Sequence, residues 1–108
     1  MTKRSPFQAI ADPTRRRILD ILKKEGPLRA GDLAKQFPEI SRPAVSRHIR
    51  ILRGASLVKP LPQGRERWYR LNPEPLDQVR QWLEDYERFW EQKLESLKKM
   101  AEELPDSK

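Results

Sequence analysis

The chain of 108 residues contains no cysteine and only one histidine. Without cysteine it can form neither a disulfide framework nor a thiolate metal site, and it has no cysteine nucleophile. A single histidine is too little for a conventional zinc site. These absences exclude several classes of secreted, metal-binding and catalytic protein, and the lack of cysteine favours a cytoplasmic location.

Long apolar runs and glycine-rich loops are lacking as well. No apolar stretch approaches the ~20 residues that a membrane-spanning helix needs, and residues 1–13 lack the apolar core of a signal peptide. With four glycines in total, a phosphate-binding loop is absent, and no Ser-His-Asp arrangement or carboxylate pair stands out. We therefore expect no membrane contact, no enzymatic activity and no cofactor.

Positive charge is abundant but unevenly distributed. The net charge is +7 at pH 7, and 36% of the residues are charged. Residues 1–75 carry 17 Lys and Arg against 7 Asp and Glu, whereas residues 76–108 carry 6 against 9. The first part therefore suits an anionic partner, and the second part has another role.

A basic helix is predicted at residues 41–53. Val45, Ile49 and Leu52 recur at helical spacing and indicate a buried face. The opposite face carries Arg and Ser side chains, which fit a DNA major groove, although a solvated face of an ordinary helix is the alternative. The candidate DNA contacts of this helix are Ser41, as N-cap, and Arg42, Ala44, Ser46, Arg47 and Arg50.

Three further helices are expected before this one. The first spans residues 5–11, and the second runs from Asp12, its N-cap, to a break at Gly26. The third covers about 30–37, and only a few residues separate it from the helix at 41–53. This spacing is typical of a helix-turn-helix.

A β-hairpin follows the basic helix. Residues 57–61 and 67–71 have the branched and aromatic composition of strands, and a turn at 62–66 joins them. Pro60 in the first strand and Pro62 at the start of the turn predict that the first strand is short, irregular and at a sheet edge. A helix-turn-helix followed by a hairpin is a winged helix, and the candidate DNA contacts of the wing are Gln63, Arg65 and Arg67.

Residues 76–104 contain neither Gly nor Pro, which predicts one helix of roughly 40 Å. Its apolar stripe is longer than one small domain can cover, so we expect it to pack against a second copy of the chain. Aromatic side chains widen the stripe and favour an interface core over a small-molecule pocket. The candidate interface residues are Leu76, Val79, Leu83, Tyr86, Trp90, Leu94 and Leu97.

Two other basic features have more than one interpretation. Arg15, Arg16 and Arg17 lie near a helix start, where the helix dipole disfavours cations, so DNA phosphates or acidic neighbours would stabilise them unless they are simply solvated. His48 lies beside Ile49 in the basic helix. A packed or hydrogen-bonded role is favoured for it over a pH switch, and contact with a DNA phosphate is a further alternative.

The chain resembles the ArsR/SmtB family of bacterial winged-helix regulators over about residues 5–75. The resemblance is carried by residues 9–19, 31–34 and 41–52 and by the hairpin ending at residues 68–71. It implies a homodimer whose first and last helices form the interface, which adds Phe7 and Ile10 to the candidates. It also implies repression by occupying a palindromic operator.

The chain differs from the metal-sensing members of this family at their ligand positions. At the start of the third helix, where such members carry thiolate ligands, this chain has Arg29 and Gly31, and residues 76–104 contain no His. Soft and borderline metals need Cys or His ligands. We therefore expect no metal at the family's known sites, and the effector, including a small molecule, stays open.

These features together predict a mainly α (α+β) winged helix-turn-helix fold. Residues 1–75 would form the DNA-binding part of a single domain, and residues 76–108 its C-terminal dimerisation helix. The favoured function is a homodimeric repressor that binds double-stranded DNA at a pseudo-palindromic operator. The alternatives are a sequence-independent architectural DNA-binding protein and a protein-interaction module that uses the aromatic C-terminal helix.

Overall fold

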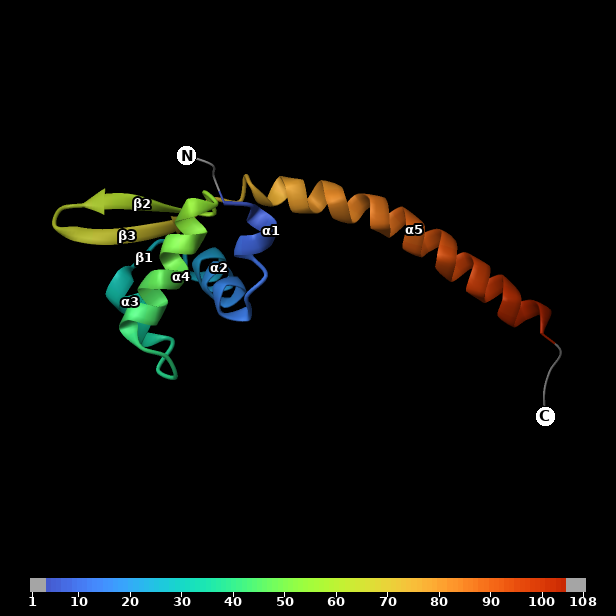
Figure 1. The fold of residues 1–108 in the computed structure, drawn as a ribbon, viewed down its shortest axis with the longest axis horizontal. Helices are drawn as coiled ribbons and strands as arrows, with labels where there is room; N and C mark the ends of the chain where they lie inside the picture. The colour runs from blue at the N-terminus through green and yellow to red at the C-terminus, as the bar shows by residue number, and fades with distance from the viewer. Residues whose placement is uncertain (1–3, 105–108) are drawn as a thin grey trace. The chain divides into compact units, whose positions relative to one another are not determined.

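The computed structural model describes residues 4–104, which divide into two units. The first unit ends at Asp77 and contains four helices and a small sheet, and the second begins at Gln78 and contains most of one long helix. Figure 1 labels these elements along the chain. Residues 1–3 and 105–108, at the outer ends of the two expected parts, lie outside the described residues.

The first two helices begin at prolines that follow a capping side chain. α1 (Pro6–Ala9) starts after Ser5, and α2 (Pro13–Glu25) starts after Asp12. In both cases the capping side chain accepts a hydrogen bond from a backbone N–H of the first turn. Gly26 ends α2 with a φ of 81°, a backbone conformation that favours glycine. Both predicted starts and this predicted end are confirmed.

The helix-turn-helix is formed by α3 (Ala30–Lys35) and α4 (Arg42–Gly54). α4 matches the predicted basic helix, and Ser41 caps it as expected. The expected range of 30–37 for α3 was wrong at its C-terminal end. The next two N–H groups bond to carbonyls only three residues back, so the chain leaves the α-helix in a tightened turn. Phe37 is nevertheless buried, with 1% of its surface exposed.

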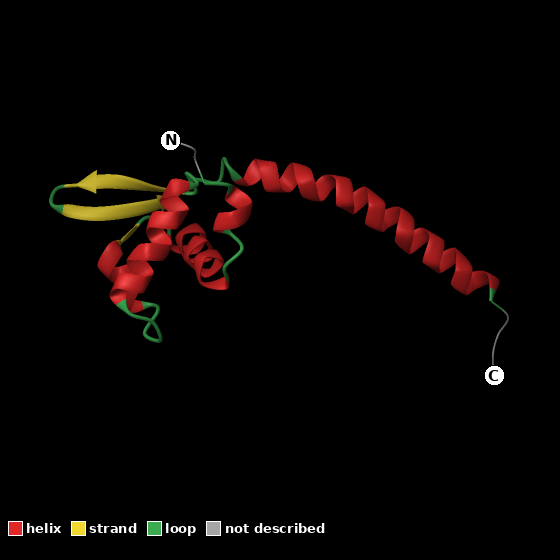
Figure 2. Ribbon diagram, in the orientation of Figure 1, coloured by secondary structure: helices red, strands yellow, loops and turns green. Residues whose placement is uncertain are grey.

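A three-stranded antiparallel sheet completes the first unit, as the yellow strands of Figure 2 show. The strands are β1 (Leu28–Arg29), β2 (Val58–Gln63) and β3 (Glu66–Leu71), in the order β1-β3-β2. The hairpin of β2 and β3 is the predicted wing, and it extends away from the helices of this unit (Figure 1). β1 was not predicted, because two residues are too few to show a strand period.

The first strand of the wing is more regular than its prolines indicated. β2 pairs with β3 without interruption from Val58 to Gln63, so the prediction of a short, irregular strand was wrong. Its predicted position at the sheet edge is confirmed. Pro60 and Pro62 stand two residues apart, so both nitrogens lie on the same side of the strand. On the free edge their missing N–H groups remove no hydrogen bond from the sheet.

The core of the first unit lies where the helices meet the sheet. Val45, Ile49 and Leu52 of α4 are buried, as their spacing predicted, and Ile21 and Ala34 are partly buried against this core. Among the described residues no polar or charged residue is buried, so every described charged residue of the first unit is at least partly exposed. The other buried hydrophobic residues are Ala9, Ile18, Leu19, Leu22, Leu33, Phe37, Ala55, Leu57, Val58 and Tyr69.

α5 (Leu76–Glu103) is one uninterrupted helix of 28 residues, about 42 Å long at ~1.5 Å per residue. The long helix predicted from the absence of Gly and Pro is confirmed, and it ends one residue before Leu104. None of its residues is buried in the single chain. In the part of the chain that is described, no helix combines the length and the apolarity needed to cross a bilayer.

Candidate nucleic-acid interface

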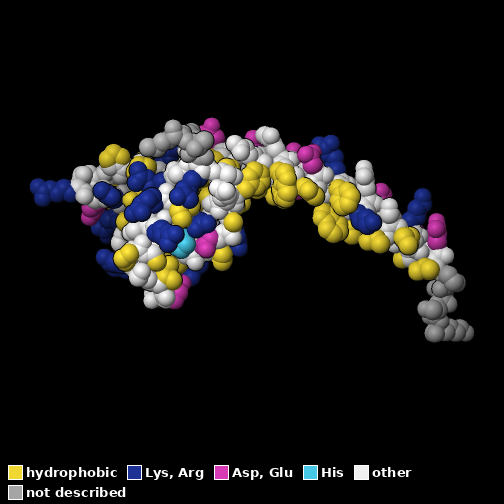
Figure 3. Space-filling model, in the orientation of Figure 1, with side chains coloured by type: hydrophobic (Ala, Val, Ile, Leu, Met, Phe, Trp, Pro, Cys, Tyr) yellow, Lys and Arg dark blue, Asp and Glu magenta, His cyan; other side chains and the backbone are white. Residues whose placement is uncertain are grey.

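The polar face of α4 is exposed and basic. Ser41 caps α4, with its hydroxyl oxygen 3.2 Å from the backbone nitrogen of Ala44. The Ala44 residue is half-buried. Figure 3 shows dark blue Lys and Arg side chains gathered on the side of the first unit where α4 lies. Within the described residues no ion pair involves the three arginines of this face. The exposed residues of this α4 face are Arg42, Ser46, Arg47 and Arg50.

A shallow hollow of about 500 Å³ lies beside the N-terminal half of α4. Arg15 of α2 lines it together with Arg47 and His48 of α4, and no carboxylate is among its lining residues. Two cationic side chains and an imidazole therefore surround this space. Its charge suits an anionic group such as a DNA phosphate, which is one of the partners that the sequence left open for Arg15 and for His48.

His48 is held in place from α2. Its Nδ1 lies 3.2 Å from Nη1 of Arg15 and 4.0 Å from Oδ2 of Asp12. Because a guanidinium group can only donate, Arg15 donates this hydrogen bond and the imidazole nitrogen accepts it. The predicted hydrogen-bonded role of His48 is confirmed, and its contact with a DNA phosphate stays a prediction.

Arg15 and Arg16 bind the end of α1. Nε of Arg15 donates to the carbonyl of Ala9 at 2.7 Å, and Nη1 of Arg16 donates to the carbonyl of Ile10 at 2.7 Å. Carbonyls at a helix C-terminus have no partner within the helix, so these bonds satisfy them. From the sequence, the expected partners of these arginines were DNA phosphates, acidic side chains or solvent. Carbonyl oxygens were not among the expected partners.

Arg17 has the acidic neighbour that the sequence left open. Its Nη1 donates to a carboxylate oxygen of Glu39 at 2.9 Å, and its guanidinium lies over the ring of Phe37, 4.6 Å from the centroid. Both contacts are to the segment between α3 and α4. Arg17 therefore fastens the turn of the helix-turn-helix to α2.

The Asp12 carboxylate caps α2 and also lies near the imidazole of His48. Its partial burial acts to raise the pKa of the carboxyl group, but the hydrogen bond from the backbone N–H of Arg15 and the electrostatic interactions with the nearby His48 and Arg15 side chains outweigh burial. The pKa of Asp12 therefore lies below its ordinary value of 3.8. A lowered pKa means that the folded chain favours the carboxylate. The stability that this group contributes is fully present above a pH of about 3.8 and is lost as the pH falls below it.

Asp12→Ala is expected to lower the free energy of unfolding by about 0.5–2 kcal/mol, because α2 loses its cap. Asp12→Asn keeps a capping oxygen without the charge. It should therefore retain most of the stability at neutral pH and abolish this residue's contribution to acid sensitivity. Urea unfolding of both variants at neutral and acidic pH measures the two effects. Equal losses in the two variants at neutral pH would contradict a role for the cap itself.

The tip of the wing is a two-residue turn of Gly64 and Arg65 between the paired residues Gln63 and Glu66. Gly64 has a φ of 64°, which a glycine adopts without strain. Gln63, Arg65 and Arg67 are all exposed. The three residues predicted as DNA contacts of the wing are therefore accessible at its end.

Arg53 extends the basic surface from α4 to the wing. A hollow of about 450 Å³ is lined by Arg53 together with Arg65 and Arg67. Arg53 is not among the DNA contacts predicted from the sequence. Its spacing of three residues from Arg50 was the available signal, since residues three apart share a helix face.

α5 exposes an apolar stripe, and Figure 3 shows yellow side chains following one another along this helix. Its aromatic rings touch each other, with centroids 4.7 Å apart for Trp82 and Tyr86 and 6.5 Å apart for Phe89 and Trp90. These contacts do not remove the rings from water. Side chains that remain between 46% and 61% exposed are Trp82, Leu83, Tyr86, Phe89, Trp90, Leu94, Leu97 and Met100.

The other four expected interface residues are less exposed. Phe7 of α1 is 38% exposed, and Val79 of α5 is half-buried. Ile10 and Leu76 pack partly against the core of the first unit. These four residues therefore offer less free apolar surface than the stripe from Trp82 onward.

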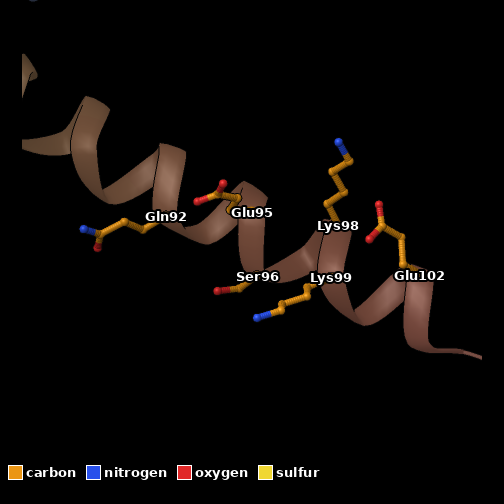
Figure 4. A pocket seen from close by; sticks show the side chains of 6 residues that line it. All are labelled: Gln92, Glu95, Ser96, Lys98, Lys99 and Glu102. Carbon is orange, nitrogen blue, oxygen red and sulfur yellow. The ribbon is translucent and has the colours of Figure 1, made fainter.

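A hollow of about 580 Å³ on the C-terminal half of α5 is not a site in the single chain. Figure 4 shows that its side chains project from one helix, with no second wall opposite them. A ligand there would meet protein on one side only, which is not how small-molecule sites are built. The side chains that line it belong to Gln92, Glu95, Ser96, Lys98, Lys99 and Glu102.

The start of α3 does not fit a metal ion. Arg29 stands there with its guanidinium 2.9 Å from a carboxylate oxygen of Asp32 and 3.0 Å from one of Glu66. Hydrogen bonds to Asp32 and to Glu66 raise the pKa of Arg29 further, so a fixed positive charge occupies this place. Across residues 4–104 no three His, Cys, Asp or Glu side chains are grouped as metal ligands.

Comparisons with known proteins agree with this geometry. A family model for a helix-turn-helix domain matches residues 10–60. The HTH-type transcriptional regulator Rv2034 of Mycobacterium tuberculosis is 47% identical over 92 residues, which cover 82% of this chain and 81% of the relative. The transcriptional repressor SdpR of Bacillus subtilis is 43% identical over 77 residues, which cover 71% and 83%.

Solved structures show the same architecture. The crystal structure of an ArsR family transcriptional regulator matches with a TM-score of 0.68 and 38% identity, covering 79% of this chain and 86% of the other. An ArsR-like transcriptional regulator from Rhodococcus sp. RHA1 matches with a TM-score of 0.67 and 33% identity, covering 93% and 92%. The chain thus shares its winged helix-turn-helix fold with these solved ArsR-like regulators.

Proposed function

The chain belongs to the ArsR family of winged helix-turn-helix transcriptional regulators, and on this basis we propose that it is a homodimeric repressor that binds a two-fold symmetric DNA site. It is a DNA-binding transcriptional regulator, as are the relatives that it matches, and it is not an enzyme. The exposed α4 face carries the proposal, because its arginines lie together on one side of a helix and have no partner within residues 4–104.

α4 is the element that enters the major groove in this proposal. Arg47 reads bases, since a guanidinium can bind a guanine edge through two hydrogen bonds, and Ala44 meets a thymine methyl group. Arg42 and Arg50 hold the helix in register by contacting phosphates, as most protein–DNA hydrogen bonds do. The hollow between Arg15 and His48 is the place for one further phosphate.

The wing contacts DNA beside this groove. Arg65 and Arg67 bind phosphates of the flanking backbone, and Arg53 joins them across the hollow that they line together. Gln63, exposed at the same tip, is placed to reach a base edge or a sugar. This division assigns sequence reading mainly to α4 and salt-dependent affinity mainly to the wing.

A second copy of the chain covers the apolar stripe of α5. Side chains such as Trp90, at 56% exposed, and Leu83, at 46%, remain in contact with water in the single chain, which is unfavourable at about 25 cal/mol per Å² of apolar surface. A two-fold interface buries the same stripe of both copies, and Phe7 of α1 adds to it. Two α4 helices related by this axis require half-sites about one turn of DNA apart, or a multiple of it.

Repression follows from occupancy of such a site. The relative SdpR is itself named a transcriptional repressor. The signal that releases this chain from DNA is not a metal at the start of α3, because a guanidinium held by Asp32 and Glu66 takes up that place. A small molecule bound elsewhere is the effector class that the residues leave open.

Selection from a random duplex library tests the proposed function. The purified chain is expected to enrich an inverted repeat whose halves are about one helical turn, or a multiple of it, apart. It should also retain at least about a thousandfold preference for this repeat over random DNA at physiological salt. Binding without an enriched motif would contradict the proposal and favour an architectural DNA-binding protein. An enriched motif without symmetry would contradict the dimer.

A further inference from the structure

One guanidinium group joins the helix-turn-helix to the wing. Arg29 of β1 precedes α3, and its Nε donates to Oδ2 of Asp32 on that helix at 2.9 Å. Its Nη1 donates to Oε1 of Glu66, the first residue of β3, at 3.0 Å. The guanidinium also lies 5.8 Å from the ring centroid of Trp68. The Arg29 guanidinium therefore contacts three side chains, one on α3 and two on β3 of the wing.

Glu66 is the carboxylate closest to the wing cations along the chain, since Arg65 and Arg67 flank it. A shallow hollow of about 370 Å³ brings the two carboxylates together with four cations. Within the described residues Arg67 makes no ion pair, whereas Glu66 is paired with Arg29. The charged lining residues of this hollow are Arg29, Asp32, Lys35, Arg42, Glu66 and Arg67.

This pairing matters because a free carboxylate would compete with DNA. Without Arg29, the cations left to neutralise Glu66 would be Lys35 and Arg42, which line the same hollow, and the wing arginines. Arg42 and the wing arginines are proposed phosphate contacts. A wing arginine that is paired with Glu66 releases no counterion from DNA, so the wing would contribute less to affinity. The Glu66 carboxylate is about half exposed, which leaves it free to move toward such partners.

We propose that Arg29 is a positioning residue for DNA binding: it keeps Glu66 occupied, so that Arg65 and Arg67 stay available to DNA phosphates. Arg29 itself does not contact DNA and acts through the Glu66 carboxylate. The inference rests on the proposed contact of the wing with the DNA backbone. It also assigns a role to the position at the start of α3 that cannot hold a metal here.

A double-mutant cycle tests the inference on the full-length chain. Wild type, Arg29→Ala, Glu66→Gln and the double variant are titrated against a fluorescein-labelled duplex of mixed sequence, about 30 base pairs long, over a series of salt concentrations. Arg29→Ala is expected to weaken binding about three- to tenfold and to reduce the salt slope by about one per chain, as the loss of a phosphate contact does. Glu66→Gln alone should change little, and the double variant should return to wild-type affinity and slope.

Additive effects would overturn the inference, because Glu66→Gln would then strengthen binding equally with and without Arg29. An unchanged salt slope in Arg29→Ala would overturn it as well. Arg29→Lys separates geometry from charge, since an ammonium group cannot bridge two carboxylates as a guanidinium does, and an intermediate loss is expected. Circular dichroism verifies that each variant folds. If wild type itself showed no salt-dependent binding, the proposed function would fail instead.

Discussion

Trp90→Glu is expected to convert the proposed homodimer into a monomer. The Trp90 side chain is 56% exposed in the single chain, at the middle of the apolar stripe of α5, so a dimer would bury it. Truncating a buried interface tryptophan typically costs about 2–4 kcal/mol, and a two-fold interface contains it twice. Dimerisation should therefore weaken by about 4–8 kcal/mol, which sedimentation velocity at micromolar concentration would report as a monomer.

Gln92→Glu is the matched control for this substitution. It adds one carboxylate to the same helix two residues away, where the sequence has no apolar stripe, and it should leave the dimer intact. Thermal unfolding of both variants distinguishes dissociation from loss of the helix. A Trp90→Glu chain that sediments like wild type would reject α5 as the dimer interface. It would then favour the alternative in which the aromatic face binds a different protein.

Arg47→Ala is expected to weaken binding to the selected DNA site by about 1–3 kcal/mol for each chain of the dimer, if Arg47 pairs with a guanine through two hydrogen bonds. Arg47 is exposed on α4 beside the hollow that it shares with Arg15. Loss of a base contact should also relax the preference at one base pair of each half-site. Competition between the selected site and its single-base variants measures both quantities.

Lys24→Ala provides the control for charge, because it removes one cation from the last turn of α2. It should change affinity for the selected site and for random duplex by the same small factor. If Arg47→Ala also weakened binding to all sequences equally, Arg47 would be a phosphate contact and not a base contact. Unchanged affinity would remove it from the interface.

The helix-turn-helix and the long helix could be predicted because their signals are local. Ser41 followed by Pro43 indicates the start of α4, and the spacing of Val45, Ile49 and Leu52 indicates its buried face. The same reasoning places Asp12 at the start of α2, and the lack of Gly and Pro defines α5. Such signals need only neighbouring residues. Local signals of this kind therefore also predicted which face of α4 is exposed and where the wing turns.

Contacts between distant elements could not be predicted in this way. Arg15 and His48 are 33 residues apart, and Arg29 and Glu66 are 37 apart, so no local period connects either pair. The prolines of β2 were misjudged for a related reason. A missing N–H disrupts a strand only on a side where another strand lies, and that depends on the order of strands in the sheet.

That strand order also limits how the chain can associate with itself. The free edge of β2 lacks N–H groups at Pro60 and Pro62, and the opposite edge of the described sheet is β1, which has two residues. Neither edge offers the continuous row of backbone donors and acceptors that recruits a strand from another molecule. Concentrated samples should therefore resist growth into β-rich fibrils, and assembly is left to contacts between helices.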